Sequence, residues 1–239
     1  MTEHVARITL ARASGGNRFT PAMAIAFAEA CARCEEDECR VVLLTAAGKD
    51  FCRGVEGRAG DWPSLAGTDF VSALARVTRP VVVAVQGRVE AEGFELALAA
   101  DLRVASPTVR FSLPQVGRGE LPRFGATQRL PRIVGSGRAL RLILLGEALA
   151  AREALGRGLV AEVSRRPEAA ALRLARALAA RAPIALRFAK EAVRRAPDLT
   201  LDDGARFEHD LYALLETTAD RAEGIRAFLA KRSPVFRGS

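Results

Sequence analysis

Short apolar segments alternate with segments of helical periodicity along most of the chain. Residues 41–45 and 81–85 form apolar runs rich in β-branched side chains, which predicts strands buried on both faces. Residues 5–11 roughly alternate apolar and polar side chains, which predicts a partly exposed strand. Thr20 and Pro21 suit the N-cap and the first position of a helix, which we expect to run to about residue 35. Further strands are predicted at 102–105, 110–113 and 159–163, and further helices at 69–77, 138–145 and 151–157.

The last part of the chain has helical periodicity throughout. Glycine and proline mark most of its breaks, and the predicted helices span 168–181, 183–195, 201–218 and 219–231. Strand–helix alternation followed by a helical tail predicts an α/β fold with a mostly parallel sheet flanked by helices. We therefore divide the chain into an α/β core, residues 1–190, and a helical C-terminal segment, residues 191–239.

The length of 239 residues fits one α/β domain, or a core with a helical tail. No run of 18 apolar residues is present and the N-terminus lacks an apolar signal core, so we expect no membrane span and a cytoplasmic protein. The formal net charge of +8 is compatible with binding to nucleic acid. The arginines are scattered and aromatic residues make up only 5% of the chain, which argues against nucleic acid and for solvated helix faces and salt bridges.

Cysteine spacing suggests a zinc site at first sight. Cys31, Cys34 and Cys39 lie close together, but no fourth ligand has a suitable spacing and both histidines are remote in sequence. We therefore expect no metal and interpret these residues as buried free thiols. Cys52 lies beside a glycine-bearing loop, and for it we also expect a packing role.

Two predicted strands lead into glycine-bearing turns. Residues 81–85 are followed by a turn and, from about Gly93, by helical spacing, so backbone N–H groups point out of the turn at the positive end of a helix dipole. Residues 46–57 form a second such loop. The two strand ends can each supply one N–H group to the same oxygen, as an anion or an oxyanion requires. Glu95 lies in the first helical turn, either simply as an acid that favours the dipole or as a functional group.

Specific motifs occupy both turns. Residues 49–56 read Lys-Asp-Phe-Cys-Arg-Gly-Val-Glu, and residues 80–101 read Pro-Val-Val-Val-Ala-Val-Gln-Gly-Arg-Val-Glu-Ala-Glu-Gly-Phe-Glu-Leu-Ala-Leu-Ala-Ala-Asp. They resemble the K-x-F-C-A-G-A-D and P-V-I-A-A-V-N-G-x-A-x-G-G-G-x-E-L-A-L-A-C-D segments of the enoyl-CoA hydratase/isomerase (crotonase) superfamily. Further segments resemble that superfamily in order, at 111–115, 122–135, 153–163 and 228–236.

The resemblance implies a crotonase-like spiral of ββα repeats with mostly parallel sheets and a helical C-terminal part. In this superfamily the C-terminal helices cover an active site in trimers or dimers of trimers. A homotrimer or a dimer of trimers is therefore expected here, with residues 191–239 as the oligomerisation or lid segment.

The resemblance also implies an acyl-CoA thioester enzyme that stabilises an enolate in a backbone oxyanion hole. By position the two donors are the N–H groups of Val55 and Glu92, and such donors are worth roughly 3–4 kcal/mol each in comparable sites. Glu92 replaces the middle residue of a Gly-Gly-Gly run, so its φ must suit a residue with a side chain. Its carboxylate either points outward with little effect, or points inward and alters the chemistry.

Hydratases of this superfamily use two glutamates, and only one is present at the matching positions. Glu95 matches the first, whereas Gln115 stands at the second, after Pro114. Glutamine cannot transfer a proton in acid–base catalysis, but it can position a water. Glu120 in the same loop, or Glu92, could replace the missing carboxylate; otherwise Glu120 is merely exposed. Burial should raise the pKa of Glu95 and the helix N-terminus should lower it.

The resemblance assigns substrate contacts to the loops around these groups. The segment that begins at residue 17 matches the loop whose backbone holds the adenine of coenzyme A, and arginines can meet its phosphates. Trp62 either walls the acyl pocket or anchors its loop. No cofactor is expected beyond the coenzyme A of the substrate, and the substrate-binding residues are expected to be Asn17, Arg18, Phe19, Arg53, Gly54, Trp62, Gly93, Pro114 and Phe124.

Hydration of an enoyl-CoA is the leading function, and three alternatives remain open. One is an isomerase, lyase or decarboxylase of the same superfamily, because members with one carboxylate often move protons without net hydration. A second is a related enzyme for acyl-carrier-protein thioesters, which residues 87–91 resemble a little. A third is a non-catalytic acyl-CoA-binding homologue, in which Gln115 and Glu92 mark lost chemistry.

Overall fold

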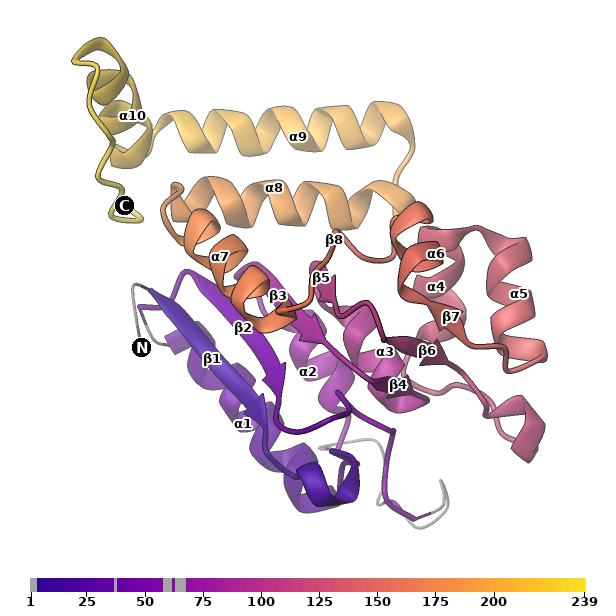
Figure 1. Cartoon of the computed structure of the whole chain (residues 1–239). Helices are drawn as coiled ribbons and strands as arrows, with labels where there is room; N and C mark the ends of the chain where they lie inside the picture. Colours follow the sequence, from indigo (N-terminus) through magenta and orange to yellow (C-terminus); the bar gives the residue numbers. More distant parts are fainter. Residues whose placement is uncertain (1–3, 37, 58–61, 63–67) are drawn as a thin grey trace.

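The computed structural model describes residues 4–36, 38–57, 62 and 68–239, and two sheets organise them (Figure 1). The larger sheet is entirely parallel, in the order β1-β2-β3-β5-β8. In the smaller sheet β4 pairs parallel with β6, which pairs antiparallel with β7. The predicted mostly parallel α/β fold is therefore confirmed. The strands are β1 (Val5–Leu10), β2 (Val41–Ala46), β3 (Val81–Val85), β4 (Arg88–Glu90), β5 (Leu102–Ala105), β6 (Arg110–Ser112), β7 (Leu149–Ala150) and β8 (Glu162–Val163).

Helices cover both faces of the larger sheet. Three of them pack on one face, namely α1 (Pro21–Glu36), α2 (Phe70–Arg76) and α3 (Glu92–Ala99). On the other face α7 (Pro167–Ala179) contributes alanines. Because side chains alternate along a strand, Val42 and Leu44 face the first layer, whereas Val41 and Leu43 face α7. This two-sided burial explains why the 41–45 run is apolar at nearly every position.

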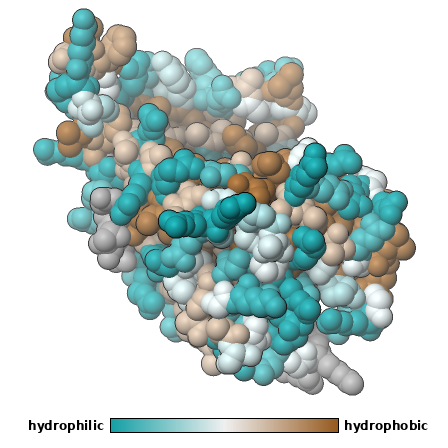
Figure 2. All heavy atoms as spheres, viewed as in Figure 1, coloured by the Kyte–Doolittle hydropathy of each residue, from teal (hydrophilic) through white to brown (hydrophobic). Residues whose placement is uncertain are grey.

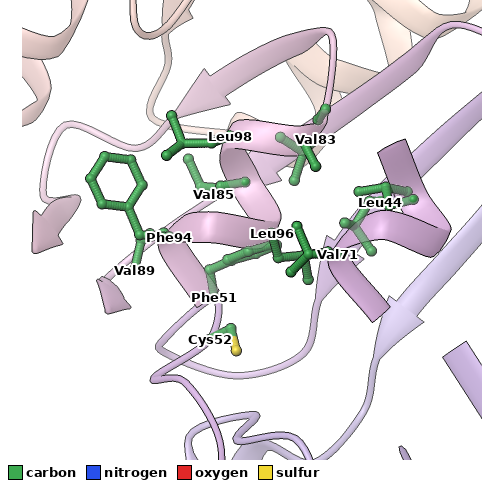
Figure 3. Close-up of a cluster of buried hydrophobic side chains, with 14 of the residues drawn as sticks. Leu44, Phe51, Cys52, Val71, Val83, Val85, Val89, Phe94, Leu96 and Leu98 are labelled. Atoms are coloured by element: carbon green, nitrogen blue, oxygen red, sulfur yellow. The ribbon is translucent and has the colours of Figure 1, made fainter. Parts of the chain in front are cut away.

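The core under α3 is closely packed (Figure 3). Leu96 and Leu98 of α3 lie beside Val83 and Val85 of β3, and all four are almost fully buried. Each such side chain contributes about 1.5–3 kcal/mol through its removal from water. This packing fixes the helix that carries Glu95.

Each end of α3 is fixed by a close contact with a segment outside the helix. Gly93 at its start lies so close to the preceding loop that an added Cβ would be 2.3 Å from the Cys52 carbonyl oxygen. At its end the buried Arg103 donates to the carbonyl oxygens of Ala97 and Ala100, at 3.1 and 2.6 Å, which satisfies the C-terminal carbonyls without a glycine cap. Burial lowers the pKa of Arg103 to about 10.

The remaining α helices all follow β6 and lead into the C-terminal part of the chain. The α helices are α4 (Ala126–Val134), α5 (Ser136–Leu144), α6 (Ala151–Gly156), α8 (Pro183–Arg195), α9 (Leu201–Glu216) and α10 (Ala219–Leu229), with short 3-10 helices η1 (Ala13–Gly15), η3 (Val116–Arg118) and η4 (Ala196–Asp198). In Figure 1, α9 and α10 lie on the far side of α8 from the sheet.

Helix α8 is tied to the core by its cationic side chains. Lys190 Nζ donates to the carbonyl oxygens of Val77 and Arg79, at 2.8 and 2.6 Å, and lies 2.7 Å from Asp101 Oδ2. Arg194 pairs with Oδ1 of the same aspartate at 2.8 Å. The expected division between residues 190 and 191 falls inside this helix and stays a prediction.

The four cysteines are all buried free thiols. Cys39 Sγ donates to the Cys34 carbonyl oxygen at 3.0 Å, and Cys52 Sγ donates to the Asn17 carbonyl oxygen at 3.1 Å. Burial raises the pKa of Cys31 and of Cys52 to about 12. Within the described ranges, no group of histidine, cysteine and acidic residues is placed to hold a metal ion. None of the helices in these ranges has the length and apolar content that a membrane crossing requires.

Candidate functional site

The Val55 N–H group points into a cavity because its neighbours bond to the other side. Phe19 bridges Val55 in parallel: Phe19 N–H donates to Gly54 O at 2.9 Å, and Glu56 N–H donates to Phe19 O at 2.8 Å. Since successive N–H groups of extended backbone alternate in direction, the Val55 N–H faces away from Phe19. It enters a cavity of about 470 Å³ lined by Arg18, Arg53, Val55, Gly57, Glu90, Ala91, Glu92, Gln115, Arg118 and Glu120.

The second strand-to-helix turn leads into α3, and Ala91 is the residue of this turn that adopts an unfavourable backbone conformation. Ala91 has φ 50° and ψ −125°, and its carbonyl oxygen accepts from the N–H groups of Phe94 and Glu95. Such a conformation costs about 1–3 kcal/mol for a residue with a side chain. Glu92 does not carry this constraint, because it is the first helical residue and its φ therefore suits a residue with a side chain. As such, its N–H has no acceptor within the helix.

The Glu92 side chain points inward. Val55 N–H donates to Glu92 Oε2 at 3.2 Å, and Glu92 Oε1 lies 4.0 Å from Arg123 Nε. The residue is only 7% exposed. Of the two orientations considered from the sequence, the inward one is therefore present, and the carboxylate covers one of the two expected oxyanion donors.

Glu95 lies deeper, and its two carboxylate oxygens differ. Oε1 accepts from the N–H groups of Phe124 and Ala126, at 2.8 and 3.0 Å. Oε2 is buried and has no hydrogen-bond partner among the described residues. Burial raises the pKa of Glu95 to about 7; hydrogen bonds from the backbone of Ala126, Phe124 and Arg123 oppose the shift, and the Glu92 carboxylate adds to it. Burial thus outweighs hydrogen bonding, so Glu95 can hold or release a proton near neutral pH.

Gln115 faces the same cavity as Glu92. Its side chain is 2% exposed, and neither amide atom has a partner among the described residues. A buried amide of this kind is costly without a ligand or a water, because its donor and acceptor are both unmet. Glu120 is half-buried at the cavity, and its N–H donates to Gln115 O at 3.0 Å. Glu95 is not among the cavity-lining residues, so the structure does not bring it into one open space with Gln115.

Charged side chains form much of the cavity wall. Arg18 and Arg53, which the resemblance assigns to substrate binding, both line it, and Arg53 Nε donates to Glu90 Oε2 at 3.0 Å. Glu90 and Arg118 also line the cavity, although neither was expected there from the sequence. A signal for each was present: Glu90 precedes Glu92 by two residues at the end of a strand, and Arg118 follows Gln115 by three.

Asn17 and Phe19 shape the site without lining the cavity. Asn17 is fully buried, accepts from Arg12 N–H with Oδ1 at 2.9 Å, and donates with Nδ2 to Ala47 O and Asp50 O. The Phe19 ring stacks on Phe70 with centroids 3.8 Å apart. These two residues fix the loops from which Arg18 and Val55 reach the cavity.

Trp62 and Phe124 pack beside Arg123. The Arg123 guanidinium lies 5.6 Å from the centroid of the Trp62 ring and 5.0 Å from that of Phe124. Trp62 Nε1 donates to Glu56 O at 2.9 Å, which ties the indole to the backbone at residue 56. Gly54 has φ 97° and lies close to the Glu92 carboxylate. Gly93 packs against Cys52. Pro114, which precedes Gln115, is half-buried.

Comparisons with known proteins place these groups in a family context. The family model described as enoyl-CoA hydratase/isomerase matches residues 1–239. The chain is 34% identical to an (E)-benzylidenesuccinyl-CoA hydratase of Thauera aromatica, over 100% of this chain and 98% of that protein. It is 35% identical to a 1,2-epoxyphenylacetyl-CoA isomerase of Escherichia coli, over 98% of this chain and 95% of that protein. A crystal structure of enoyl-CoA hydratase from Mycobacterium tuberculosis superposes with a TM-score of 0.94 at 29% identity, covering 100% of this chain and 97% of that one.

Proposed function

The chain belongs to the enoyl-CoA hydratase/isomerase family, and from that premise we propose that Glu95 transfers the proton in its reaction on an acyl-CoA thioester. Hydration of an enoyl-CoA is the leading reaction. In it a water adds at C3, a proton reaches C2, and the thioester oxygen carries negative charge on the way. The N–H groups of Val55 and Glu92 are the proposed donors to that oxygen.

The state of Glu95 is the observation that carries the proposal. Its pKa is raised to about 7, one oxygen is fixed by two backbone donors, and the other has no partner among the described residues. A general acid–base group works best when its pKa lies near the working pH. Gln115, on the neighbouring cavity wall, is proposed to position the water through its unmet amide.

A proton-shuttling isomerase is the second candidate. It is favoured by one observation, the amide of Gln115 where a hydratase would have its second carboxylate. A single carboxylate can take a proton from one carbon and return it to another, which an isomerase requires and net hydration does not. The similarity to an isomerase named for 1,2-epoxyphenylacetyl-CoA agrees with this candidate.

Coenzyme A is proposed to bind along the cavity rim. Arg18 and Arg53 supply cationic groups there, and charge-assisted hydrogen bonds from arginine to phosphate are strong and often bidentate. Arg53 already pairs with Glu90, so a phosphate would compete with that carboxylate for its guanidinium.

A homotrimer or a dimer of trimers is proposed as the assembly. Large apolar side chains are exposed on the C-terminal helices, with Leu201 88% and Phe228 81% exposed. Figure 2 shows hydrophobic residues among hydrophilic ones over these helices. Exposed apolar area of this kind marks interaction surfaces. A mass in solution equal to the 25.6 kDa of one chain would count against the assembly.

An activity comparison tests the reaction. Purified protein is incubated with crotonyl-CoA, and loss of the enoyl absorbance reports hydration. Incubation with a 3-enoyl-CoA, followed by product analysis, reports double-bond migration. Hydration of the first substrate supports the leading reaction, and migration alone supports the isomerase. Binding of either ligand without turnover would support the non-catalytic alternative.

A further inference from the structure

We propose that Glu92 masks the oxyanion hole of the resting protein, so that an acyl-CoA thioester must displace its carboxylate before its carbonyl can be polarised. The inference rests on the proposed function, because it concerns the donors that would hold a thioester oxygen. Its basis is the hydrogen bond from Val55 N–H to Glu92 Oε2, at 3.2 Å inside the cavity.

Glu92 Oε2 occupies the place of a ligand oxygen. The Val55 N–H is directed into the cavity, and its acceptor must lie within about 3 Å along that direction. Gly54 leaves the room for it: a Cβ on Gly54 would lie 2.6 Å from Glu92 Oε2. A thioester oxygen and this carboxylate oxygen therefore compete for one donor.

Negative charge on both oxygens makes the Glu92 carboxylate and the thioester oxygen less compatible as the reaction proceeds. The thioester oxygen becomes negative in the enolate, and a carboxylate held beside it would repel that charge in a poorly solvated site. Glu92 is only 7% exposed, so water screens the repulsion weakly. Glu92 must leave Val55 for the hole to do its work.

Arg123 offers the displaced carboxylate a second position. Its Nε lies 4.0 Å from Glu92 Oε1, and packing of the guanidinium against the Trp62 and Phe124 rings places it on that side. A turn of the Glu92 side chain toward Arg123 would exchange a hydrogen bond from Val55 for a closer ion pair. The unmasked state then has both the donor and the carboxylate satisfied.

Two ligands that differ only in the carbonyl measure the masking. Butyryl-CoA carries a thioester carbonyl and no double bond, whereas S-butyl-CoA is the matching thioether. Their dissociation constants are measured by calorimetry for the wild type, Glu92→Gly and Glu92→Ala. We expect butyryl-CoA to bind at least about tenfold more tightly to both variants, a fraction of the 100- to 1000-fold that one donor is worth in turnover. S-butyl-CoA should change less than about twofold, since it makes no use of the donor.

Two further variants act as controls. Glu92→Gln keeps an acceptor for Val55 but has no charge, so the butyryl-CoA affinity should lie between those of the wild type and Glu92→Gly. Glu90→Gln removes a carboxylate that lines the same cavity and pairs with Arg53 and Arg88. It should alter the affinity for both ligands by the same factor, because neither contact involves Val55. Thermal unfolding of each variant verifies that it is folded.

Arg123→Met tests the second position. Without the guanidinium, Glu92 should stay on Val55, and butyryl-CoA should bind more weakly in the single variant. In the Glu92→Gly background, Arg123→Met should have a smaller effect on the ratio of the dissociation constants for butyryl-CoA and S-butyl-CoA. Such coupling between the two residues is what a shared carboxylate predicts.

The outcomes separate the inference from the function it rests on. If both ligands bind and Glu92→Gly leaves their affinity ratio unchanged, Glu92 does not mask the hole, while acyl-CoA binding stands. If Glu92→Gly weakens butyryl-CoA alone, Glu92 instead supports thioester binding and the masking inference is overturned. If neither ligand binds any form of the folded protein, the proposed function itself is refuted, and the masking inference with it.

Discussion

Glu92 and Glu95 begin the same helix one turn apart, yet their carboxylates lie in two different regions. Glu92 lies on the wall of the 470 Å³ cavity, with a backbone donor and an arginine close by. Glu95 lies behind the N–H groups of Phe124 and Ala126, is fully buried, and has one oxygen without a partner among the described residues. The Glu92 carboxylate is therefore surrounded by polar and charged groups, whereas the Glu95 carboxylate lies where water is excluded.

The difference shows how one helical turn can hold two acids for different tasks. Removal from water destabilises a carboxylate more than two backbone donors stabilise it, so Glu95 takes up a proton near neutral pH. Glu92 instead accepts a hydrogen bond from Val55 N–H and lies 4.0 Å from Arg123 Nε. We therefore assign proton transfer to the deep region and control of the thioester oxygen to the cavity wall.

Replacement of the deep carboxylate should have the largest effect. Glu95→Gln keeps an oxygen that can accept from Phe124 and Ala126, but it cannot transfer a proton. Turnover of the enoyl-CoA substrate should fall by about 100- to 10,000-fold, the usual worth of a general acid–base group. Steady-state kinetics measure the loss, and unchanged affinity for butyryl-CoA would verify an intact site. Full activity of Glu95→Gln together with an inactive Glu92→Gln or Glu120→Gln would mean that the working carboxylate lies in the cavity instead.

The raised pKa of Glu95 should also appear in stability. A carboxyl group whose pKa is raised on folding stabilises the protein fully below its ordinary pKa of 4.5, and this contribution is lost as pH rises through about 7. The difference between these pKa values corresponds to roughly 3 kcal/mol. Glu95→Gln lacks this dependence. The free energy of unfolding of the wild type, relative to Glu95→Gln, should therefore fall between pH 4.5 and 7; a constant difference would place the pKa of Glu95 near its ordinary value.

A carboxylate placed at residue 115, which lines the same cavity as Glu92, should give a smaller gain. Gln115→Glu supplies the group that the two-glutamate hydratases use, in a position already open to the cavity. Hydration of crotonyl-CoA should rise about tenfold, less than the full worth of an optimised acid–base group. Gln115→Met, which has similar size and no polar head group, is the matched control and should not raise it. No gain from Gln115→Glu would indicate that the missing carboxylate does not limit hydration.

The smallest predicted effect concerns Trp62, which packs beside Arg123. The centroid of its ring lies 5.6 Å from the Arg123 guanidinium and 6.4 Å from the centroid of the Phe70 ring. Trp62→Phe keeps an aromatic ring but removes the hydrogen bond to Glu56 O, so the free energy of unfolding should fall by about 1 kcal/mol. Urea unfolding measures this change. The pH dependence that Glu95 causes should stay as in the wild type, and a change in it would show that Trp62 helps to keep water from Glu95.

The strands and helices around the site could be predicted because local pattern decides them. The apolar run at residues 81–85 predicts a buried strand, and the structure has β3 with these bounds. Strands β4 and β7 were not predicted, since they have three and two residues and depend on β6 for their pairing. The pattern at residues 159–163 predicts one strand, but only β8 at the end of this range pairs with β5.

The sequence by itself determined the family, the buried strands and the place of Glu95 in the first turn of α3. These follow from residue order, periodicity and motif spacing, which need no contact between distant segments. Only the tertiary structure decided that the Glu92 side chain turns inward and that burial raises the pKa of Glu95 more than hydrogen bonds lower it. The first depends on Val55, which lies 37 residues before Glu92, and the second on Phe124, which lies 29 residues after Glu95. Side-chain direction and loss of water are set by such distant neighbours, so no local pattern contains them.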